Sequence, residues 1–132
     1  GEMLFVCTRN SARSQLASAL WSDRTGRPSS SAGTHPVARV HRGAVAAARR
    51  RGLSLDGVVP RSLGDVSPGV QVVTVCDMVH EELVPESGWW HWSIPDPVEP
   101  GSAAAFDAVV DELDARIGMV IEVMQRQQGD GR

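Results

Sequence analysis

Four segments of the chain have strand character, of which two are clear hydrophobic runs and two have weaker patterns. Met3–Val6 is apolar throughout and Val70–Val75 is rich in β-branched residues, so both predict buried strands. Ser29–Ala32 and Trp89–Trp92 have weaker patterns and are predicted as the other two strands. The chain is therefore expected to form a four-stranded sheet.

The residues between these strands carry apolar side chains at helical spacing. The predicted helices are Ser14–Arg24, the alanine-rich Val40–Arg51, the short Asp77–Leu83, and a long final helix that Ser102 caps and that runs through Val123. Residues 56–68 are predicted to form a mixed loop with one short helical turn near Leu63, and residues 125–132 a frayed polar tail.

Alternation of strands and helices favours an α/β fold, a three-layer sandwich around a central four-stranded parallel sheet. Right-handed crossovers place the first strand near the centre of that sheet. Residues 1–132 are expected to be a single domain, in which residues 1–2 are a cloning remnant or the join to an upstream segment. Cys7, Cys76 and Asp96 all follow predicted strands and should meet at the carboxyl edge, where such sheets carry their active sites.

Composition argues against several classes of function. A net charge of −3 provides no basic face for nucleic acid, and the one basic run, Arg49–Arg51, falls at a predicted helix end where cations suit the dipole. Two cysteines are too few for a secreted disulfide scaffold, and no signal peptide or membrane span is present. The histidines and cysteines lack metal-ligand spacing, so no metal site is expected. A cytoplasmic protein is predicted.

The segment from Cys7 to Ser14 carries the most specific chemical signal, a C-x5-R-S pattern between the first strand and the first helix. A helix N-terminus leaves N–H groups unpaired and carries partial positive charge, so a loop over it is an anion cradle. The same field and the Arg13 guanidinium favour the thiolate form of Cys7. The guanidinium is also suited to grip two oxygens of a tetrahedral anion.

A buried structural cysteine beside a surface arginine is the alternative interpretation of this segment, and its position between strand and helix disfavours that alternative. We predict Cys7 as nucleophile and Arg13 as oxyanion clamp. The short side chains of Asn10 and Ser14 are suited to holding the loop or tuning the thiolate. The predicted oxyanion-binding residues are Thr8, Arg9, Asn10, Ser11, Ala12, Arg13 and Ser14.

The pattern resembles the active-site loop of the low-molecular-weight protein tyrosine phosphatase superfamily, which includes the arsenate reductases coupled to thioredoxin or mycothiol. Three further segments resemble segments of that superfamily and occur in the expected order: residues 31–34, residues 72–77 and His91–Pro97. The sequence of His91–Pro97 is closer to that of the arsenate reductases. The resemblance implies that Asp96, held between two prolines, is a general acid. A plain turn aspartate is the alternative for Asp96.

Cys76 matches the second cysteine of the thioredoxin-coupled arsenate reductases, where a thiol resolves the cysteine–arsenic adduct by forming a disulfide. A buried packing cysteine is its alternative. The third cysteine of that relay is absent from this sequence. The position where it would stand lies near Leu83. No cofactor is expected to be bound, and an external thiol reductant, either mycothiol with mycoredoxin or thioredoxin, is the implied redox partner.

Other positions depart from the superfamily. Arg9 stands where glycine is usual, Ala12 replaces a common cysteine, and Ser18 replaces an acidic residue of the first helix. The chain has no tyrosine to hold an aryl group, so three tryptophans, Trp89, Trp90 and Trp92, are candidates for that contact, for core packing or for partner docking.

Three functions follow as hypotheses. The first is arsenate reduction, favoured by the sequence of His91–Pro97 and by the presence of Cys76. The second is phosphomonoester hydrolysis, as in a low-molecular-weight protein tyrosine phosphatase, through a cysteinyl-phosphate, which needs only Cys7, Arg13 and Asp96. The third is a non-catalytic oxyanion-binding regulatory module. The expected partners are a small oxyanion or phosphate ester and a redox protein or small thiol, with no nucleic acid and no membrane.

Overall fold

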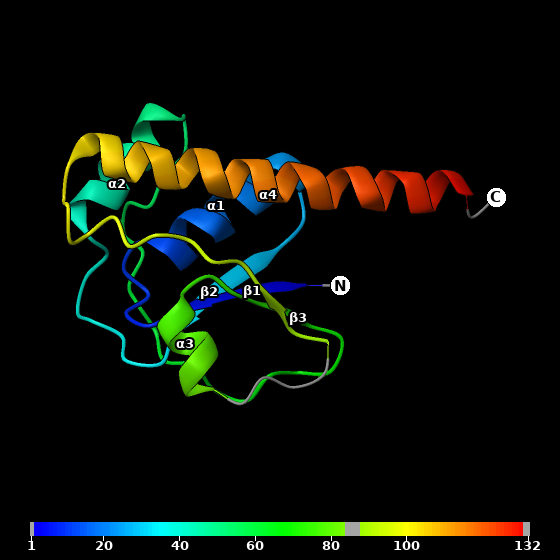
Figure 1. Ribbon diagram of the computed structural model, residues 1–132, viewed down its shortest axis with the longest axis horizontal. Coiled ribbons are helices and arrows are strands. Elements are labelled where there is room, and N and C mark those ends of the chain that lie inside the picture. The colour runs from blue at the N-terminus through cyan, green and yellow to red at the C-terminus, as the bar shows by residue number, and fades with distance from the viewer. Residues whose placement is uncertain (1, 84–87, 131–132) are drawn as a thin grey trace.

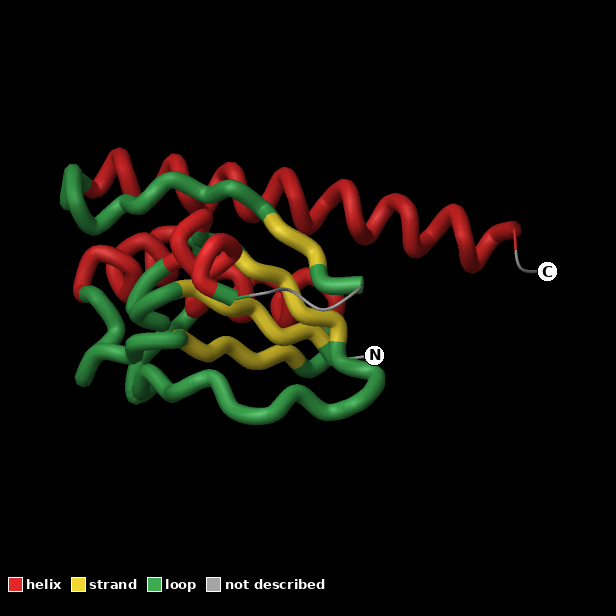
Figure 2. The backbone as a smooth tube through the Cα atoms, turned by 60° about the horizontal axis from the view of Figure 1, so that its bottom comes forward, coloured by secondary structure: helices red, strands yellow, loops and turns green. Residues whose placement is uncertain are grey.

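The computed structural model describes residues 2–83 and 88–130 and contains a parallel four-stranded sheet. The strands lie in the order β2-β1-β3-β4, so the first strand is central, as predicted. Their bounds are β1 Met3–Cys7, β2 Ser29–Gly33, β3 Gln71–Thr74 and β4 Trp90–His91. In register, Cys7 pairs with Gly33 and Val6 with Thr74, which brings the carboxyl ends of three neighbouring strands to one edge (Figure 2).

Four helices accompany the sheet within the described ranges. They are α1 Arg13–Thr25, α2 Arg42–Arg50, α3 Asp77–Glu82 and α4 Ala103–Asp130. Figure 1 shows α1, α2 and α4 gathered together, with α4 running past them, while α3 lies at the end of the sheet near β1 and β3. The predicted α/β fold with a parallel sheet and flanking helices is therefore confirmed.

Burial explains why these segments fold as they do. All five residues of β1 are buried, as a strand covered on both faces requires. Leu16, Leu20 and Trp21 of α1 face the core, and α4 contributes a stripe at helical spacing. The buried residues of that stripe are Phe106, Val109, Val110, Leu113 and Ile117. Ser102 precedes α4 and its Oγ accepts a hydrogen bond from the Ala105 N–H at 3.1 Å, as its predicted capping role requires.

Two local predictions were wrong. The segment near Leu63 is extended rather than helical, because Ser62 forms a parallel bridge with Gly33 and Leu63 donates to the Gly33 carbonyl at 2.8 Å. The end of β2 offers backbone partners there, which a sequence pattern does not reveal. The final helix also continues to Asp130 instead of fraying from Gln125, and residues 131–132 lie outside the described part.

The basic run at the end of α2 is neutralised by aspartates. Arg49 pairs with Asp56 at 2.6 Å, Arg50 with Asp107 at 2.7 Å, and Arg51 with Asp111 at 2.8 Å. The last two pairs connect the end of α2 and its C-cap residue, Arg51, to α4. Exposed pairs of this kind contribute little stability individually. The position of Arg49 and Arg50 in the last turn of α2 confirms the interpretation of this run as a helix end.

Candidate active site

The loop between β1 and α1 turns its carbonyl groups outward. The carbonyls of Thr8, Arg9 and Ser11 accept hydrogen bonds from the backbone N–H groups of His35, Val37 and His41 at 2.7, 3.2 and 2.9 Å. Because the two ends of a peptide unit point in opposite directions, carbonyls that face out leave the following N–H groups facing inward. The loop is thereby shaped as the predicted anion cradle.

Helix α1 adds its own N-terminus to this cradle. Its N-cap residue is Ala12, and no side-chain hydrogen bond caps the helix within the described part of the chain. The first N–H groups of the helix are thus open to a ligand. Gly33 allows β2 to approach the loop closely, since a Cβ atom there would lie 2.6 Å from the Thr8 carbonyl oxygen.

The Cys7 thiol lies at the start of this loop in a buried hydrogen-bond network. Cys7 Sγ is 2.9 Å from Ser14 Oγ, and Ser14 Oγ accepts a hydrogen bond from Asn10 Nδ2 at 2.8 Å. Because the oxygen of Ser14 is used as an acceptor by Asn10, its one hydroxyl hydrogen is available to the sulfur. A donor aimed at the sulfur would hold the nucleophile in place at the start of the loop.

Asn10 adopts a conformation that supports this role. Its φ is +53°, in the left-handed region that asparagine tolerates better than most residues, and it is fully buried. Asn10 Nδ2 also donates to Ser31 Oγ at 2.9 Å, and Gln15 Nε2 donates to Asn10 Oδ1 at 3.0 Å. The amide is therefore held from β2 and α1 together.

Substitution Asn10→Asp tests the direction of this network. The carboxylate offers only acceptors, so Ser14 would donate to it and the sulfur would lose its donor. We expect alkylation of Cys7 by iodoacetamide to slow about tenfold, the order of one hydrogen bond to a charged group. The rate is measured on the Cys7 peptide by mass spectrometry at fixed pH. Ser31→Ala removes one acceptor of the same amide but leaves Ser14 accepting from Asn10, so it should slow alkylation less, by about threefold. An unchanged rate in Asn10→Asp would contradict the proposed direction.

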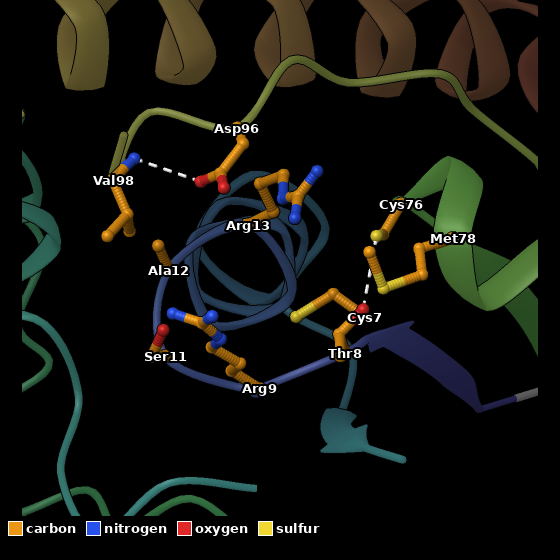
Figure 3. Close-up of a pocket in the computed structure, with 10 residues that line it drawn as sticks. All are labelled: Cys7, Thr8, Arg9, Ser11, Ala12, Arg13, Cys76, Met78, Asp96 and Val98. Carbon is orange, nitrogen blue, oxygen red and sulfur yellow. Dashed lines mark hydrogen bonds between the residues drawn. The ribbon is translucent and has the colours of Figure 1, made fainter. Parts of the chain in front are cut away.

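A small pocket opens above the loop and gathers most of the predicted site residues (Figure 3). Asn10 and Ser14, which were predicted to bind the oxyanion, are fully buried and do not line it. Its volume is about 110 Å³, well below the range of about 300–1,000 Å³ of drug-sized ligand sites, which suits a compact ion or a single reacting group. The residues that line it are Cys7, Thr8, Arg9, Ser11, Ala12, Arg13, Cys76, Met78, Asp96 and Val98. The structure therefore brings together all four predicted catalytic residues.

Arg13 and Asp96 reach the pocket from different elements. Arg13 begins α1, and its Nη1 donates to the Ile94 carbonyl at 3.0 Å, which ties the guanidinium to the segment that carries Asp96. Asp96 Oδ1 accepts from the Val98 N–H at 2.9 Å, an Asx turn that fixes the carboxylate. Figure 3 shows Asp96 on the opposite side of the pocket from Thr8 and Arg9. Asp96 is thus both a turn residue and a pocket residue.

Cys76 follows β3 and lies in the same pocket as Cys7. Its Sγ is 3.3 Å from Thr8 Oγ1, and both cysteines are buried and unbridged. Burial raises the pKa of the Cys76 thiol, but the hydrogen bonds with Thr8 and with the Val79 backbone, together with the charge of Arg13, outweigh it and hold the pKa below its usual value. Cys76 thus has more thiolate character than a packed structural cysteine.

A second group of polar side chains braces the Asp96 segment. His91 Nδ1 lies 2.7 Å from Thr74 Oγ1 and His91 Nε2 lies 2.8 Å from Asp77 Oδ1. Ser93 Oγ donates to Asp77 Oδ2 at 3.0 Å. The hydrogen bonds from His91 and Ser93 hold the pKa of Asp77 below its usual value. The start of α3, just after Cys76, is thereby linked to the chain that leads to Asp96.

Several network residues were not predicted from the sequence. Ser31 and Arg61 reach Asn10 from distant parts of the chain, and Gln15 reaches it from α1. The position of Asp77 directly after Cys76 was a signal in the sequence that could have identified it. The sequence offered no comparable signal for Arg61, which stands in an irregular segment.

The three tryptophans do not lie at the pocket. Trp92 is buried with its ring 5.9 Å from that of Phe5, Trp90 belongs to β4, and Trp89 lines a separate hollow beside Gln71 and Gly88. Of the described residues that line the Cys7 pocket, none is aromatic. The aryl-holding role considered for the tryptophans is therefore not supported.

Two further observations concern other kinds of site. Over residues 2–83 and 88–130, no group of three or more histidine, cysteine or acidic side chains is placed to hold a metal ion. In the same part of the chain, none of the helices combines the length and the apolar character needed to cross a bilayer.

Solved structures with the same architecture carry different activities. An arsenate reductase from Archaeoglobus fulgidus is 27% identical with a TM-score of 0.76, over 91% of this chain and 98% of its own. The YwlE arginine phosphatase from Geobacillus stearothermophilus is 23% identical with a TM-score of 0.80, over 99% of this chain and 97% of its own. The tyrosine phosphatase Wzb from Escherichia coli K30 is 21% identical with a TM-score of 0.76, over 93% and 97%.

A search of curated proteins found no significant match to the sequence. A family model, low molecular weight phosphotyrosine protein phosphatase, matches residues 2–129. That match spans the cradle, both cysteines and the Asp96 segment, and the similar structures are enzymes. The chain is therefore an enzyme that belongs to the low-molecular-weight phosphotyrosine protein phosphatase family.

Proposed function

We propose that this protein is an arsenate reductase. The observation that carries the proposal is the second thiol: Cys76 lines the same small pocket as Cys7 and has a lowered pKa. A phosphatase needs no such thiol. The non-aromatic lining and the small volume of the pocket also fit an inorganic oxyanion better than an aryl phosphate.

In the first step, the Cys7 thiolate attacks the arsenic atom of arsenate, a sulfur–arsenic bond forms, and one arsenate oxygen leaves as water. The inward-facing amides and Arg13 stabilise the charge on the remaining oxygens. Asp96 supplies the proton that the leaving oxygen requires. Ser14 holds the thiolate until it attacks.

In the second step, the Cys76 thiolate attacks Cys7 Sγ. A sulfur–sulfur bond forms and the sulfur–arsenic bond breaks, with its electron pair remaining on arsenic. Arsenic is reduced by two electrons and leaves as arsenite, while the two thiols are oxidised to a disulfide. The position of Thr8 at 3.3 Å from Cys76 Sγ keeps this thiol beside the loop.

The enzyme must then be reduced from outside. The chain contains two cysteines, and both are used in the disulfide, so no internal third thiol can continue the relay. Two electrons must come from a thiol donor, for which mycothiol with mycoredoxin or thioredoxin are our candidates. We propose no bound cofactor.

Phosphomonoester hydrolysis is the second candidate. Cys7, Arg13 and Asp96 surround the pocket and would suffice for a cysteinyl-phosphate intermediate. The Asx turn at Asp96 holds a carboxylate where an acid would be needed. A non-catalytic binding module, the third hypothesis, is disfavoured because the family is one of enzymes and the complete set of side chains is present.

The deciding experiment measures arsenite released from arsenate by the purified protein, with mycothiol and mycoredoxin in one arm and thioredoxin in another. Hydrolysis of p-nitrophenyl phosphate runs in parallel. Arsenite release in either arm supports the reductase, and turnover with thioredoxin implicates a Cys7–Cys76 disulfide. Rapid ester hydrolysis without arsenite would replace our proposal with the phosphatase.

The substitution Asp96→Asn should slow ester hydrolysis about 100-fold, because general acid catalysis contributes at least about that factor. Loss of an acid is recognised by its dependence on the leaving group. The hydrolysis rate of phenyl phosphate, which has the poorer leaving group, should fall more than that of p-nitrophenyl phosphate. Glu99→Gln, an exposed carboxylate in the same segment, is the matched control and should keep its rate. Equal, small losses for both esters would leave Asp96 as a turn residue only.

A further inference from the structure

Arg61 connects the irregular segment after α2 to the network beneath Cys7. Its backbone N–H donates to Asn10 Oδ1 at 3.0 Å, across 51 positions of sequence. Its Nε donates to the Ser31 carbonyl at 2.8 Å, and its own carbonyl accepts from the Gly33 N–H at 2.9 Å. One residue thus contacts both the loop and the end of β2.

These contacts fix which way the Asn10 amide faces. A backbone N–H can only donate, so the group that Arg61 meets must be the amide oxygen of Asn10. The amide nitrogen is then forced toward Ser14 and Ser31, at 2.8 and 2.9 Å. With Gln15 Nε2 as the second donor to Oδ1, all four hydrogen-bonding positions of the Asn10 amide are filled.

We propose that Arg61 is a positioning residue for the Cys7 thiol, acting through Asn10 and Ser31 without touching substrate. Its backbone sets the orientation of Asn10, which makes Ser14 an acceptor and directs the Ser14 hydroxyl hydrogen to the sulfur. Its guanidinium holds the Ser31 backbone, so that Ser31 Oγ stays under the Asn10 amide nitrogen.

The location of Arg61 separates this role from those of the other arginines. Arg61 does not line the Cys7 pocket, whereas Arg9 and Arg13 do. The oxyanion cradle should therefore persist without its side chain. Arg61 is also exposed, so removing the guanidinium opens no cavity in the core and the fold should be retained. The proposal depends on Cys7 as the reactive thiol and holds for arsenate or phosphate ester alike.

The test compares Arg61→Met, Arg61→Lys and the control Arg27→Met with the wild type. Arg27 is exposed and precedes the opposite end of β2. The first readout is alkylation of Cys7 by iodoacetamide at fixed, mildly acidic pH, measured on the Cys7 peptide by mass spectrometry. The second is binding of inorganic phosphate by calorimetry, and the third is the melting temperature.

We expect alkylation in Arg61→Met to slow about threefold, and no more than in Ser31→Ala, because the guanidinium acts through Ser31. Phosphate affinity and melting temperature should stay near those of the wild type. Arg61→Lys should recover much of the rate because its ammonium can still donate to the Ser31 carbonyl, and Arg27→Met should have the wild-type rate.

Two results would overturn the proposal. One is a wild-type alkylation rate in Arg61→Met. The other is a joint loss of alkylation, phosphate affinity and melting temperature that Arg61→Lys does not recover, since this would make Arg61 a general structural residue. Because alkylation needs no turnover, either result can be distinguished from a failure of the reductase assignment.

Discussion

Replacing Cys7 with serine is expected to abolish both arsenite release and ester hydrolysis. A hydroxyl is a far weaker nucleophile than a thiolate, and Cys76, the other thiol that lines the pocket, is hydrogen-bonded to Thr8 and is not part of the loop that forms the cradle. The loss should reach about 10⁴-fold or more, as removal of a nucleophile does in other covalent catalysts. The measurement is turnover of arsenate and of p-nitrophenyl phosphate by Cys7→Ser beside the wild type.

Binding separates loss of the nucleophile from loss of the site. The inward-facing amides and Arg13 do not depend on the sulfur, so Cys7→Ser should still bind inorganic phosphate. Retained binding with no turnover is the expected pair of results. Full turnover by the variant would refute the mechanism for both reactions, and loss of binding would show that the substitution disturbs the loop.

The part of this site that could be predicted from the sequence consists of residues close together in the chain. Cys7 and Arg13 are joined by one short loop between a strand and a helix, and the strand and helix patterns were clear enough to place both. Parallel pairing of β3 with β1 then carried Cys76 to the same edge, which follows from strand order and needs no knowledge of side chains. The central position of the first strand was predictable for the same reason.

What could not be predicted depends on contacts between irregular segments. Arg61 reaches Asn10 because Ser62 pairs with Gly33 at the end of β2, and no periodicity marks such a bridge. A helical turn was expected there because local pattern was the only guide. The outward carbonyls of the loop are likewise fixed by residues 35–41, which follow β2 and carry no motif.

The direction in which a side chain points was a second feature that the sequence did not predict. Trp90 and Trp92 are two positions apart and differ in burial: Trp90 is 40% exposed and Trp92 only 7%. The sequence placed both near the Asp96 segment but did not show that Trp92 would pack on Phe5 in the core. The choice between an aryl contact and a core residue required coordinates.

Replacing Cys76 with alanine is expected to separate the two reactions. Ester hydrolysis needs only Cys7, Arg13 and Asp96, so Cys76→Ala should hydrolyse p-nitrophenyl phosphate at nearly the wild-type rate. Arsenite release needs a thiol that attacks Cys7 Sγ, and Cys76 lines the same pocket with a lowered pKa that favours its thiolate. Steady-state arsenite release should therefore fall to background with either reductant.

A single-turnover experiment without external reductant tests the same step directly. The wild type should release at most one equivalent of arsenite per chain and lose two hydrogen atoms in its intact mass as the Cys7–Cys76 disulfide forms. Cys76→Ala should show neither change. If Cys76→Ala instead turns over with mycothiol as fast as the wild type, the external thiol resolves the adduct, and Cys76 is a packing residue whose lowered pKa follows from Thr8 and Val79 alongside Arg13.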